Sequence, residues 1–202
     1  LHRSTVLEVI MTQKQLLVST DVVFSGTKLN IRNEIWLMKK NGQDIKVQQQ
    51  VAEHAPIVVL VPIDQEGNIY LVRQFRRPTK VLLLETPAGT IEAGEEPRNA
   101  ALRELKEETG YAAKEIINIG GFWIAPGWSD GFAYIYVCTG LEPAYAEPDE
   151  DEDINLVVTP LHEIPNLIKD GTICDAKSVA ALQMVLFLHP EQLTGSSLVE
   201  GT

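Results

Sequence analysis

Short apolar runs separated by turn residues occupy most of the chain up to residue 85, and this pattern predicts β-strands. Two or three strands are expected between residues 16 and 50, where Asn41-Gly42 has the composition of a hairpin turn. The continuous apolar run at 57–61 is typical of a buried strand. Further strands are expected at 69–72 and 81–84, and Pro87-Ala88-Gly89 then predicts a loop.

A helical pattern starts at Pro97, whose missing N–H costs nothing in the first turn of a helix. Ala101, Leu102 and Leu105 then form one apolar face, and Gly110 suits the left-handed position just beyond the helix end. We therefore expect a helix over 97–109. Beyond it, the pattern predicts strands near 116–122, 132–137 and 156–158, a short helix over 161–169 and a longer helix over 175–188.

Strands and helices are mixed without the strict alternation of a parallel sheet, which indicates an α+β fold with a mixed β-sheet between helices. We interpret residues 51–188 as the main domain and residues 1–50 as an N-terminal antiparallel β appendage. Within the appendage, residues 1–10 precede Met11, a candidate native start, and are treated as outside the fold. The small polar residues of 189–202 predict a flexible tail.

The charge and composition of the chain argue against several classes of protein. The formal net charge of -11 argues against a general nucleic-acid binder, which would carry a basic surface. No apolar run approaches the ~20 residues that cross a bilayer, and no basic segment followed by an apolar stretch marks a leader peptide. Cys138 and Cys174 are far apart, so we expect two buried thiols in a cytoplasmic protein rather than a disulfide or zinc site.

Three glutamates, Glu104, Glu107 and Glu108, lie three and four residues apart in the expected helix and share one side of it. Carboxylates packed in this way repel each other, whereas a helix that needs only solubility would interleave lysines. One interpretation is a solvated acidic face with an ion pair such as Arg103–Glu107. The other is a divalent cation among the carboxylates, since Mg²⁺ takes oxygen ligands.

The residues around these three glutamates favour the interpretation of a bound divalent cation. The segment Gly89-x5-Glu95-x7-Arg103-Glu104-Leu105-x-Glu107-Glu108-x-Gly110-Tyr111 resembles the Nudix box, with every charged and glycine position filled. Nudix enzymes hydrolyse a nucleoside diphosphate linked to another group, and they hold Mg²⁺ or Mn²⁺ on a strand–loop–helix. The resemblance implies that Glu104 and Glu108 are the main metal ligands, with Glu107 assisting and the carbonyl of Ala88 as a further ligand. It also implies that Arg103 orients the loop by holding Glu95.

Three further stretches, 72–77, 83–89 and 125–130, resemble the ADP-ribose pyrophosphatase branch of that family. Pro126 stands fifteen residues beyond Tyr111, the spacing associated with ADP-ribose hydrolysis. Together with similar residues at 169–171 and 175–178, the resemblance covers about residues 50–188. It implies conversion of ADP-ribose to AMP and ribose 5-phosphate. Enzymes that act on GDP-mannose or other nucleotide sugars share much of this pattern and are the alternative. Many members carry a glutamate where Gly131 stands, which puts one sugar or adenosine contact in doubt.

The same resemblance implies substrate contacts from Arg76, Glu85, Pro126, Gly127, Trp128, Ser129, Asp130 and, in the N-terminal strands, Trp36. Arg76 is a candidate phosphate clamp, because a guanidinium suits bidentate phosphate contact, and an ordinary surface arginine is the alternative. Glu85 either contacts the terminal ribose or the metal shell, or is a surface-strand carboxylate. Trp128 either lines the substrate pocket or belongs to the core.

The acidic stretch at 147–153 resembles the loop from which this branch draws its catalytic glutamate. Glu150 and Glu152 are the two candidates for the general base, and Glu150 is slightly favoured. The remaining acids of this loop are expected to be solvated.

The N-terminal strands resemble the segment through which members of this branch form homodimers, often by exchange between subunits. Phe24 or Trp36 would then stack on adenine in the partner's site. A non-catalytic sensor that binds ADP-ribose is the competing class of function. It is disfavoured because all the box glutamates are present and no helix-turn-helix segment is left over.

Overall fold

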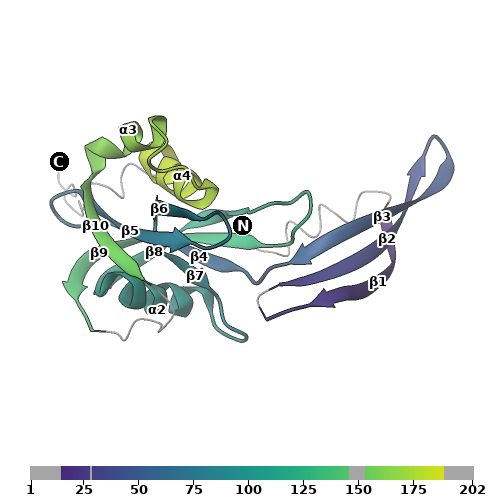
Figure 1. Ribbon diagram of the computed structural model, residues 1–202, viewed down its shortest axis with the longest axis horizontal. Helices are drawn as coiled ribbons and strands as arrows, with labels where there is room; N and C mark the ends of the chain where they lie inside the picture. The colour runs from purple at the N-terminus through teal and green to yellow at the C-terminus, as the bar shows by residue number, and fades with distance from the viewer. Residues whose placement is uncertain (1–14, 28, 146–152, 189–202) are drawn as a thin grey trace, which may run out of the picture. The chain divides into compact units, whose positions relative to one another are not determined.

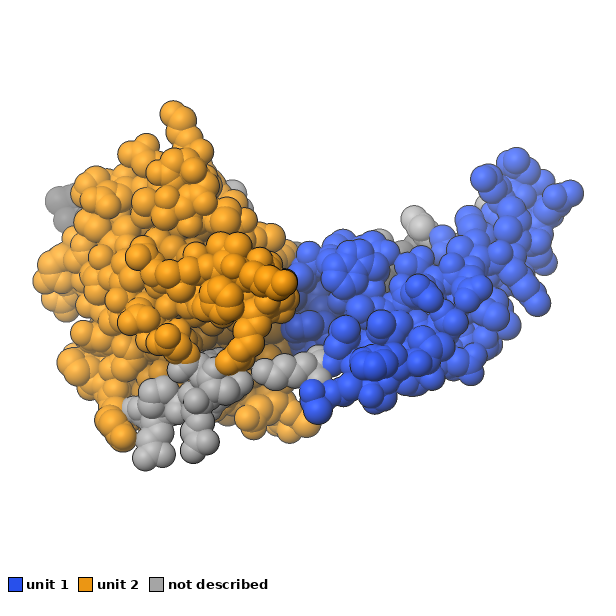
Figure 2. Space-filling view, viewed as in Figure 1, with its two compact units in different colours: residues 1–55, 123–132 blue, residues 56–122, 133–202 orange. Residues whose placement is uncertain are grey.

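The computed structural model describes residues 15–27, 29–145 and 153–188, and Figure 1 shows its helices and strands. The predicted tail and the first ten residues lie outside the described residues. The chain divides into two compact units, which Figure 2 distinguishes by colour: residues 1–55 with 123–132, and residues 56–122 with 133–202. The boundary that we expect near residue 50, between an N-terminal appendage and a main domain, remains a prediction.

The first unit contains an antiparallel sheet in the order β1-β2-β3, formed by Gln15–Ser25, Asn30–Lys40 and Gln43–Glu53. The predicted hairpin turn is present, because Asn41 and Gly42 have φ angles of 52° and 81° and Lys40 pairs with Gln43. Both strands of this hairpin are longer than expected, since their backbone pairing continues without interruption to Asn30 and Glu53.

The second unit holds two sheets and three α-helices among its described residues. Its elements are β4 (Ile57–Pro62), β5 (Asn68–Arg76), β6 (Val81–Glu85), β7 (Ala88–Thr90), α2 (Pro97–Thr109), β8 (Tyr111–Trp123), β9 (Phe132–Pro143), β10 (Ile154–Pro160), α3 (Ile164–Lys169) and α4 (Ala176–Gln183). A mixed sheet has the order β7-β4-β9-β8, with β4 parallel to β9, and an antiparallel sheet has the order β10-β5-β6. The α+β class is thereby confirmed.

Strand β4 lies at the centre of the hydrophobic core, which accounts for its continuous apolar sequence. Val59 belongs to a buried cluster with Leu182 of α4, whereas its neighbour Val58 belongs to a second cluster with Leu105 of α2. All four side chains are inaccessible to solvent. Because successive side chains of a strand point to opposite faces, β4 is apolar at every position when helices cover both faces. Figure 1 shows α2 on one side of these strands and α3 with α4 on the other.

Two local predictions are wrong. The segment at Pro87-Ala88-Gly89 is not wholly a loop, because Ala88 and Gly89 pair with Val59 and Val58 of β4 as the short strand β7. The predicted helix at 175–188 ends its α-helical part at Gln183 and continues as a π-helical turn, Met184–Leu188. Both outcomes depend on tertiary pairing or packing that a local sequence pattern does not contain.

The two thiols differ, which corrects the expectation that both are buried. Cys138 is buried in β9, and this burial raises the pKa of its thiol to about 12, whereas Cys174 is exposed. No helix in the described part of the chain has the length and apolar character to span a membrane.

Candidate active site

The site is built on the strand β7, the loop that follows it and the helix α2. Pro97 opens α2, and Gly110 closes it in the left-handed conformation with φ at 74°, its N–H donated to the carbonyl of Lys106. Ala101 and Leu105 are fully buried and fix the helix against β4. This packing turns the glutamates of α2 towards β7 and the loop.

Two of these glutamates lie directly against the backbone of β7. The Ala88 N–H donates a hydrogen bond of 2.9 Å to Oε2 of Glu108. A Cβ added at Gly89 would lie 1.7 Å from Cδ of Glu104, so a side chain there would displace that carboxylate. Only a glycine lets strand and helix approach this closely, which is why the box needs it. Glu104 and Glu108 therefore converge on one short piece of backbone.

Arg103 ties the remaining acids together. Its Nη1 donates to Oε1 of Glu104 at 2.7 Å and to Oε2 of Glu107 at 2.9 Å. Its Nε and Nη2 donate to Glu95 at 3.1 and 3.0 Å, and Nη2 also reaches the carbonyl of Thr90 at 3.0 Å. The hydrogen bond from Arg103 is the main cause that lowers the pKa of Glu95 below its ordinary value. The contact expected between Arg103 and Glu95 is thus present, and it ties the loop to the helix.

The donor set fits a hard divalent cation. Three carboxylates, those of Glu95, Glu104 and Glu107, pair with the single guanidinium of Arg103, and the carboxylate of Glu108 lies against the Ala88 backbone, so the cluster carries an excess of negative charge. Carboxylate and carbonyl oxygens are the ligands that Mg²⁺ and Mn²⁺ prefer. Among the described residues no three acidic, histidine or cysteine side chains are already grouped as a metal site. Arg103 and the Ala88 N–H engage these carboxylates instead.

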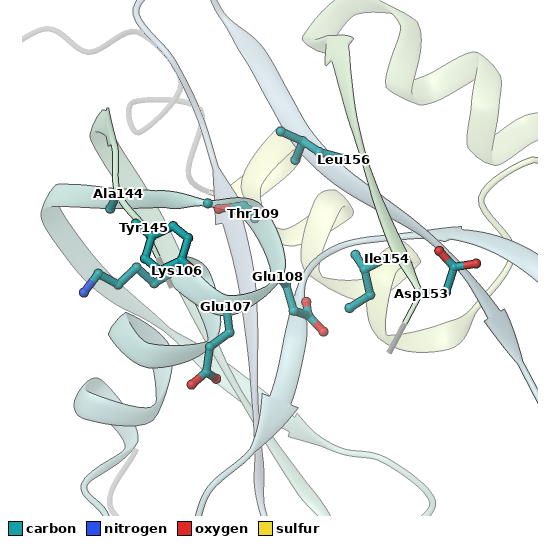
Figure 3. A pocket seen from close by; sticks show the side chains of 10 residues that line it. Lys106, Glu107, Glu108, Thr109, Ala144, Tyr145, Asp153, Ile154 and Leu156 are labelled. Atoms are coloured by element: carbon teal, nitrogen blue, oxygen red, sulfur yellow. The ribbon is translucent and has the colours of Figure 1, made fainter. Parts of the chain in front are cut away.

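Glu108 is more buried than a helix-face carboxylate usually is. It is 8% exposed, so it does not belong to a solvated acidic face. Beside it lies a cavity of about 360 Å³, formed by the end of α2, the residues after β9 and the start of β10. Figure 3 shows Glu108 on the side of α2 that faces Ile154, with Asp153 and Tyr145 also at this cavity. The candidate bases, Glu150 and Glu152, lie outside the described residues.

Arg76 and Glu85 form an ion pair across β5 and β6, in which Glu85 is buried and Arg76 is partly exposed. Nε of Arg76 lies 3.0 Å from Oε1 of Glu85, and Nη2 lies 2.6 Å from Oε2. Glu85 is only 1% exposed, so the interpretation of a surface carboxylate is wrong. Burial raises the pKa of Glu85, but the hydrogen bonds and charges of Arg76 and Lys177 outweigh it and leave the pKa below its ordinary value. The hydrogen bond to Glu85 is the main cause that raises the pKa of Arg76, and the charge of Glu108 adds to it.

Sequence reasoning assigned no role to Lys177, although this lysine lies in the stretch 175–178 that resembles the same branch. Its Nζ lies 2.5 Å from Oε2 of Glu85, although the two residues are 92 positions apart. A second local signal is that Asp175, two residues earlier, has the type and position of a helix N-cap, which predicts where α4 begins. Nothing in that signal says which strand the helix start contacts.

The remaining predicted contacts belong to the first unit. Pro126, Gly127, Trp128, Ser129 and Asp130 lie in its segment at 123–132. Trp128 is 62% exposed, so the interpretation of a core tryptophan is wrong.

Asp130 and Trp36 have partners within the first unit. The carboxylate of Asp130 accepts hydrogen bonds of 3.0 Å from both Nη2 of Arg32 and the backbone N–H of His54. Trp36 donates from Nε1 to Oε2 of Glu34 at 2.9 Å, and Nε of Arg32 donates to the other oxygen of that carboxylate. These bonds connect β2 with the end of β3 and with the segment that carries Trp128.

The α+β fold and the carboxylate-lined strand–loop–helix fit an enzyme class that holds a cation beside an anionic substrate. Residues 53–182 match the NUDIX domain. The chain is 33% identical to the ADP-ribose pyrophosphatase of Bacillus subtilis over 82% of this chain and 89% of that protein. It is 36% identical to the methanol dehydrogenase activator of Bacillus methanolicus over 82% of this chain and 89% of that protein.

A solved structure described as an ADP compounds hydrolase superposes with a TM-score of 0.77 at 26% identity, covering 90% of this chain and 97% of that one. The chain therefore belongs to the Nudix family. It is a Nudix hydrolase, an enzyme class that generally works with a divalent metal.

Proposed function

We propose that this enzyme hydrolyses the pyrophosphate bond of ADP-ribose with Mg²⁺ or Mn²⁺ and releases AMP and ribose 5-phosphate. The observation that supports it most is the convergence of Glu104 and Glu108 on the Ala88–Gly89 backbone. The ADP-ribose pyrophosphatase of Bacillus subtilis and the ADP compounds hydrolase structure support an ADP-containing substrate.

The reaction consumes one water molecule, which has to give up a proton. The oxygen of water bonds to one phosphorus, the bond from that phosphorus to the bridging oxygen breaks, and the other phosphate leaves with that oxygen. A bound divalent cation would neutralise the phosphate oxygens and lower the pKa of the attacking water. Glu104 and Glu108, with Glu107 and the carbonyl of Ala88, are the proposed ligands. Glu150 or Glu152 is the proposed base that accepts the proton of the water.

Arg103 and Arg76 have different proposed roles. Arg103 binds Glu95, Glu104 and Glu107, so it holds the loop and the ligands in register rather than contacting substrate. Arg76 is a proposed contact to the substrate's phosphates, because Glu85 fixes its guanidinium through Nε and Nη2 while its side chain is 36% exposed.

The proposed contacts to the rest of the substrate come from the first unit and from Glu85. Trp128 offers an exposed ring for stacking, and Trp36 offers a partly buried ring from β2. Pro126, Gly127, Ser129 and Asp130 complete the proposed set, all within the segment at 123–132.

We further propose a cytoplasmic homodimer formed through the N-terminal sheet. Strand β1 exposes an unusual number of apolar side chains: Leu16, Leu17, Val18, Val22, Val23 and Phe24 are each between 41% and 65% exposed. A protein surface of this kind is expected to be covered by a partner. The free thiols of Cys138 and Cys174 fit a reducing compartment.

The test is turnover of a panel consisting of ADP-ribose, GDP-mannose, ADP-glucose, NADH and a dinucleoside polyphosphate, with Mg²⁺ and with Mn²⁺. The proposal predicts AMP and ribose 5-phosphate from ADP-ribose as the fastest reaction. Faster release of GMP from GDP-mannose would replace ADP-ribose by the alternative nucleotide sugar. Tight binding of ADP-ribose with no mononucleotide released would favour the sensor instead.

A further inference from the structure

We propose that Lys177 is a positioning residue for substrate binding, which holds the Glu85 carboxylate and thereby sets the guanidinium of Arg76. This inference rests on the proposed function, in which Arg76 contacts a phosphate of the substrate. Neither the metal ligands nor the catalytic base is involved, so Lys177 is expected to affect binding rather than the chemical step.

The contacts form a chain of three charged side chains. Oε2 of Glu85 receives two cations at once, Nη2 of Arg76 at 2.6 Å and Nζ of Lys177 at 2.5 Å. The other oxygen, Oε1, receives Nε of Arg76 at 3.0 Å. The carboxylate therefore cannot rotate without breaking a charged hydrogen bond on each side. A bidentate arginine pair is the geometry that best fixes the plane of a guanidinium.

The charge balance shows why a second cation is needed. Glu85 is almost completely buried, and a buried carboxylate is stable only when it is paired and hydrogen-bonded. Without Lys177, Glu85 would neutralise the charge of Arg76. The carboxylate of the nearby Asp175 would then be an excess negative charge where a phosphate has to bind. Lys177 cancels that excess, so that Arg76 can attract an anion while it stays paired with Glu85.

The start of α4 holds Lys177 in position. Asp175, the N-cap, accepts hydrogen bonds from the backbone N–H of Ser178 at 3.1 Å and from Nζ of Lys177 at 3.0 Å. The fully buried Ser178 accepts the backbone N–H of Thr86 at 2.8 Å. The first turn of α4 is therefore bonded to the residue that follows Glu85, and the side chain of Lys177 is only 17% exposed. This lysine has little freedom to serve any other partner.

The first experiment compares Lys177→Met and Lys177→Arg with the wild type in steady-state kinetics on ADP-ribose. Lys177→Met should raise KM by roughly tenfold, the scale of one lost charge-assisted contact, and leave kcat within about twofold. Lys177→Arg should bring KM most of the way back to the wild-type value, because a guanidinium keeps a positive charge beside Glu85. Lys114→Met is the matched control, since it removes an exposed lysine–glutamate pair of 2.5 Å, with Glu142, and should change neither constant.

A double-mutant cycle with Glu85→Gln separates positioning from direct contact with substrate. If Lys177 acts through Glu85, adding Lys177→Met to Glu85→Gln should raise KM no further. A second, equal rise in KM in the Glu85→Gln background would overturn the proposal, as would a loss confined to kcat. Neither Glu85→Gln nor the double variant contains the Glu85 carboxylate, so the comparison between these two proteins stays decisive even if Lys177→Met alone folds poorly.

Failure of the proposed function would be visible in the wild type, which would then not release AMP from ADP-ribose. In that case the cycle is measured on whichever panel compound is hydrolysed, because Arg76 and Lys177 are assigned to the diphosphate that all these compounds share. A calorimetric titration with a methylene-bridged ADP-ribose analogue gives a second readout. Lys177→Met should weaken this binding by the same factor as it raises KM, and unchanged binding would contradict the inference.

Discussion

At the scale of single residues, the site depends on one close approach between a backbone and a carboxylate. Gly89 is forced to be a glycine by Glu104 rather than by its own backbone angles, because the space for a Cβ is already filled by that side chain. The neighbouring Ala88 N–H binds Glu108. Strand β7 and helix α2 thus position each other through the groups that are proposed to bind the metal.

Gly89→Ala should therefore impair catalysis more than folding. The added methyl meets the far end of a flexible side chain, so Glu104 moves away at small cost in stability while the metal site loses a ligand. We expect kcat to fall by roughly a hundredfold, with the melting temperature changed by only a few degrees. Steady-state kinetics with Mg²⁺ and thermal unfolding measure the two effects. A large loss of stability together with normal kcat would contradict this assignment of Glu104.

Glu85 should make folding stability depend on pH. Its pKa is lower in the folded protein than the ordinary value of 4.5, because Arg76 and Lys177 outweigh the effect of burial. A depressed carboxyl pKa contributes stability that is fully present above the unfolded pKa and is lost as the pH falls through the folded pKa. The free energy of unfolding in urea should thus decline below about pH 4.5.

The control for this prediction is Glu85→Gln, which cannot titrate at that position. Its stability at neutral pH should be lower than that of the wild type, because Arg76 and Lys177 lose their shared anion. Its decline towards acid pH should also be shallower. Parallel pH profiles for the two proteins would show that Glu85 does not contribute.

At the scale of elements, the loop between β7 and α2 is held by Arg103. This side chain binds Glu95 and the Thr90 carbonyl on the loop side and two glutamates on the helix side. The helix itself is anchored separately, through Leu105 in the core. Loss of Arg103 should therefore loosen the loop without unfolding α2.

Arg103→Met is expected to speed backbone hydrogen exchange at 91–96 while residues 100–108 keep their protection. Hydrogen exchange followed by mass spectrometry measures both regions in one experiment. We also expect kcat to fall by about tenfold or more, because Glu104 and Glu107 lose a common partner. Unchanged exchange at 91–96 would show that the loop does not depend on this arginine.

The elements themselves show what the sequence could predict. Helix α2 was predictable to the residue, because Pro97 and Gly110 are local signals for its two ends. Strand β7 was not, because its three residues pair only where β4 provides an edge. The contact between Lys177 and Glu85 has no local signal at all, and it appears only when α4 folds back onto β6. The box motif predicted which glutamates lie together on α2. It did not predict that Glu108 is buried, because that depends on how the helix packs.

At the scale of the whole molecule, the acidic protein has to accept a polyanionic substrate. With a formal net charge of -11, long-range electrostatics oppose binding, and only local positive charge reverses this. The proposed metal would supply that charge, and Lys177 would offset the negative charge of the acids beside Arg76. Removing the divalent ion with a chelator should accordingly weaken binding of a methylene-bridged ADP-ribose analogue as well as stop turnover.

The apolar surface of β1 makes the oligomeric state testable. Leu16 and Val22 are 63% and 65% exposed, so the double substitution Leu16→Asp with Val22→Asp should leave the fold of one chain intact. In sedimentation velocity the wild type should behave as a dimer and this variant as a monomer. Phe187→Asp, at a side chain 72% exposed in the second unit, is the control and should stay dimeric. A monomeric wild type would remove the proposed homodimer.

The central claim is that carboxylates of α2 hold a divalent cation against the backbone of β7. A crystal soaked with Mn²⁺ and the methylene-bridged ADP-ribose analogue, measured by anomalous diffraction, tests it most directly. The prediction is an anomalous peak within coordination distance of Glu104, Glu108 and the Ala88 carbonyl. Analogue density with no peak near these three groups would contradict it.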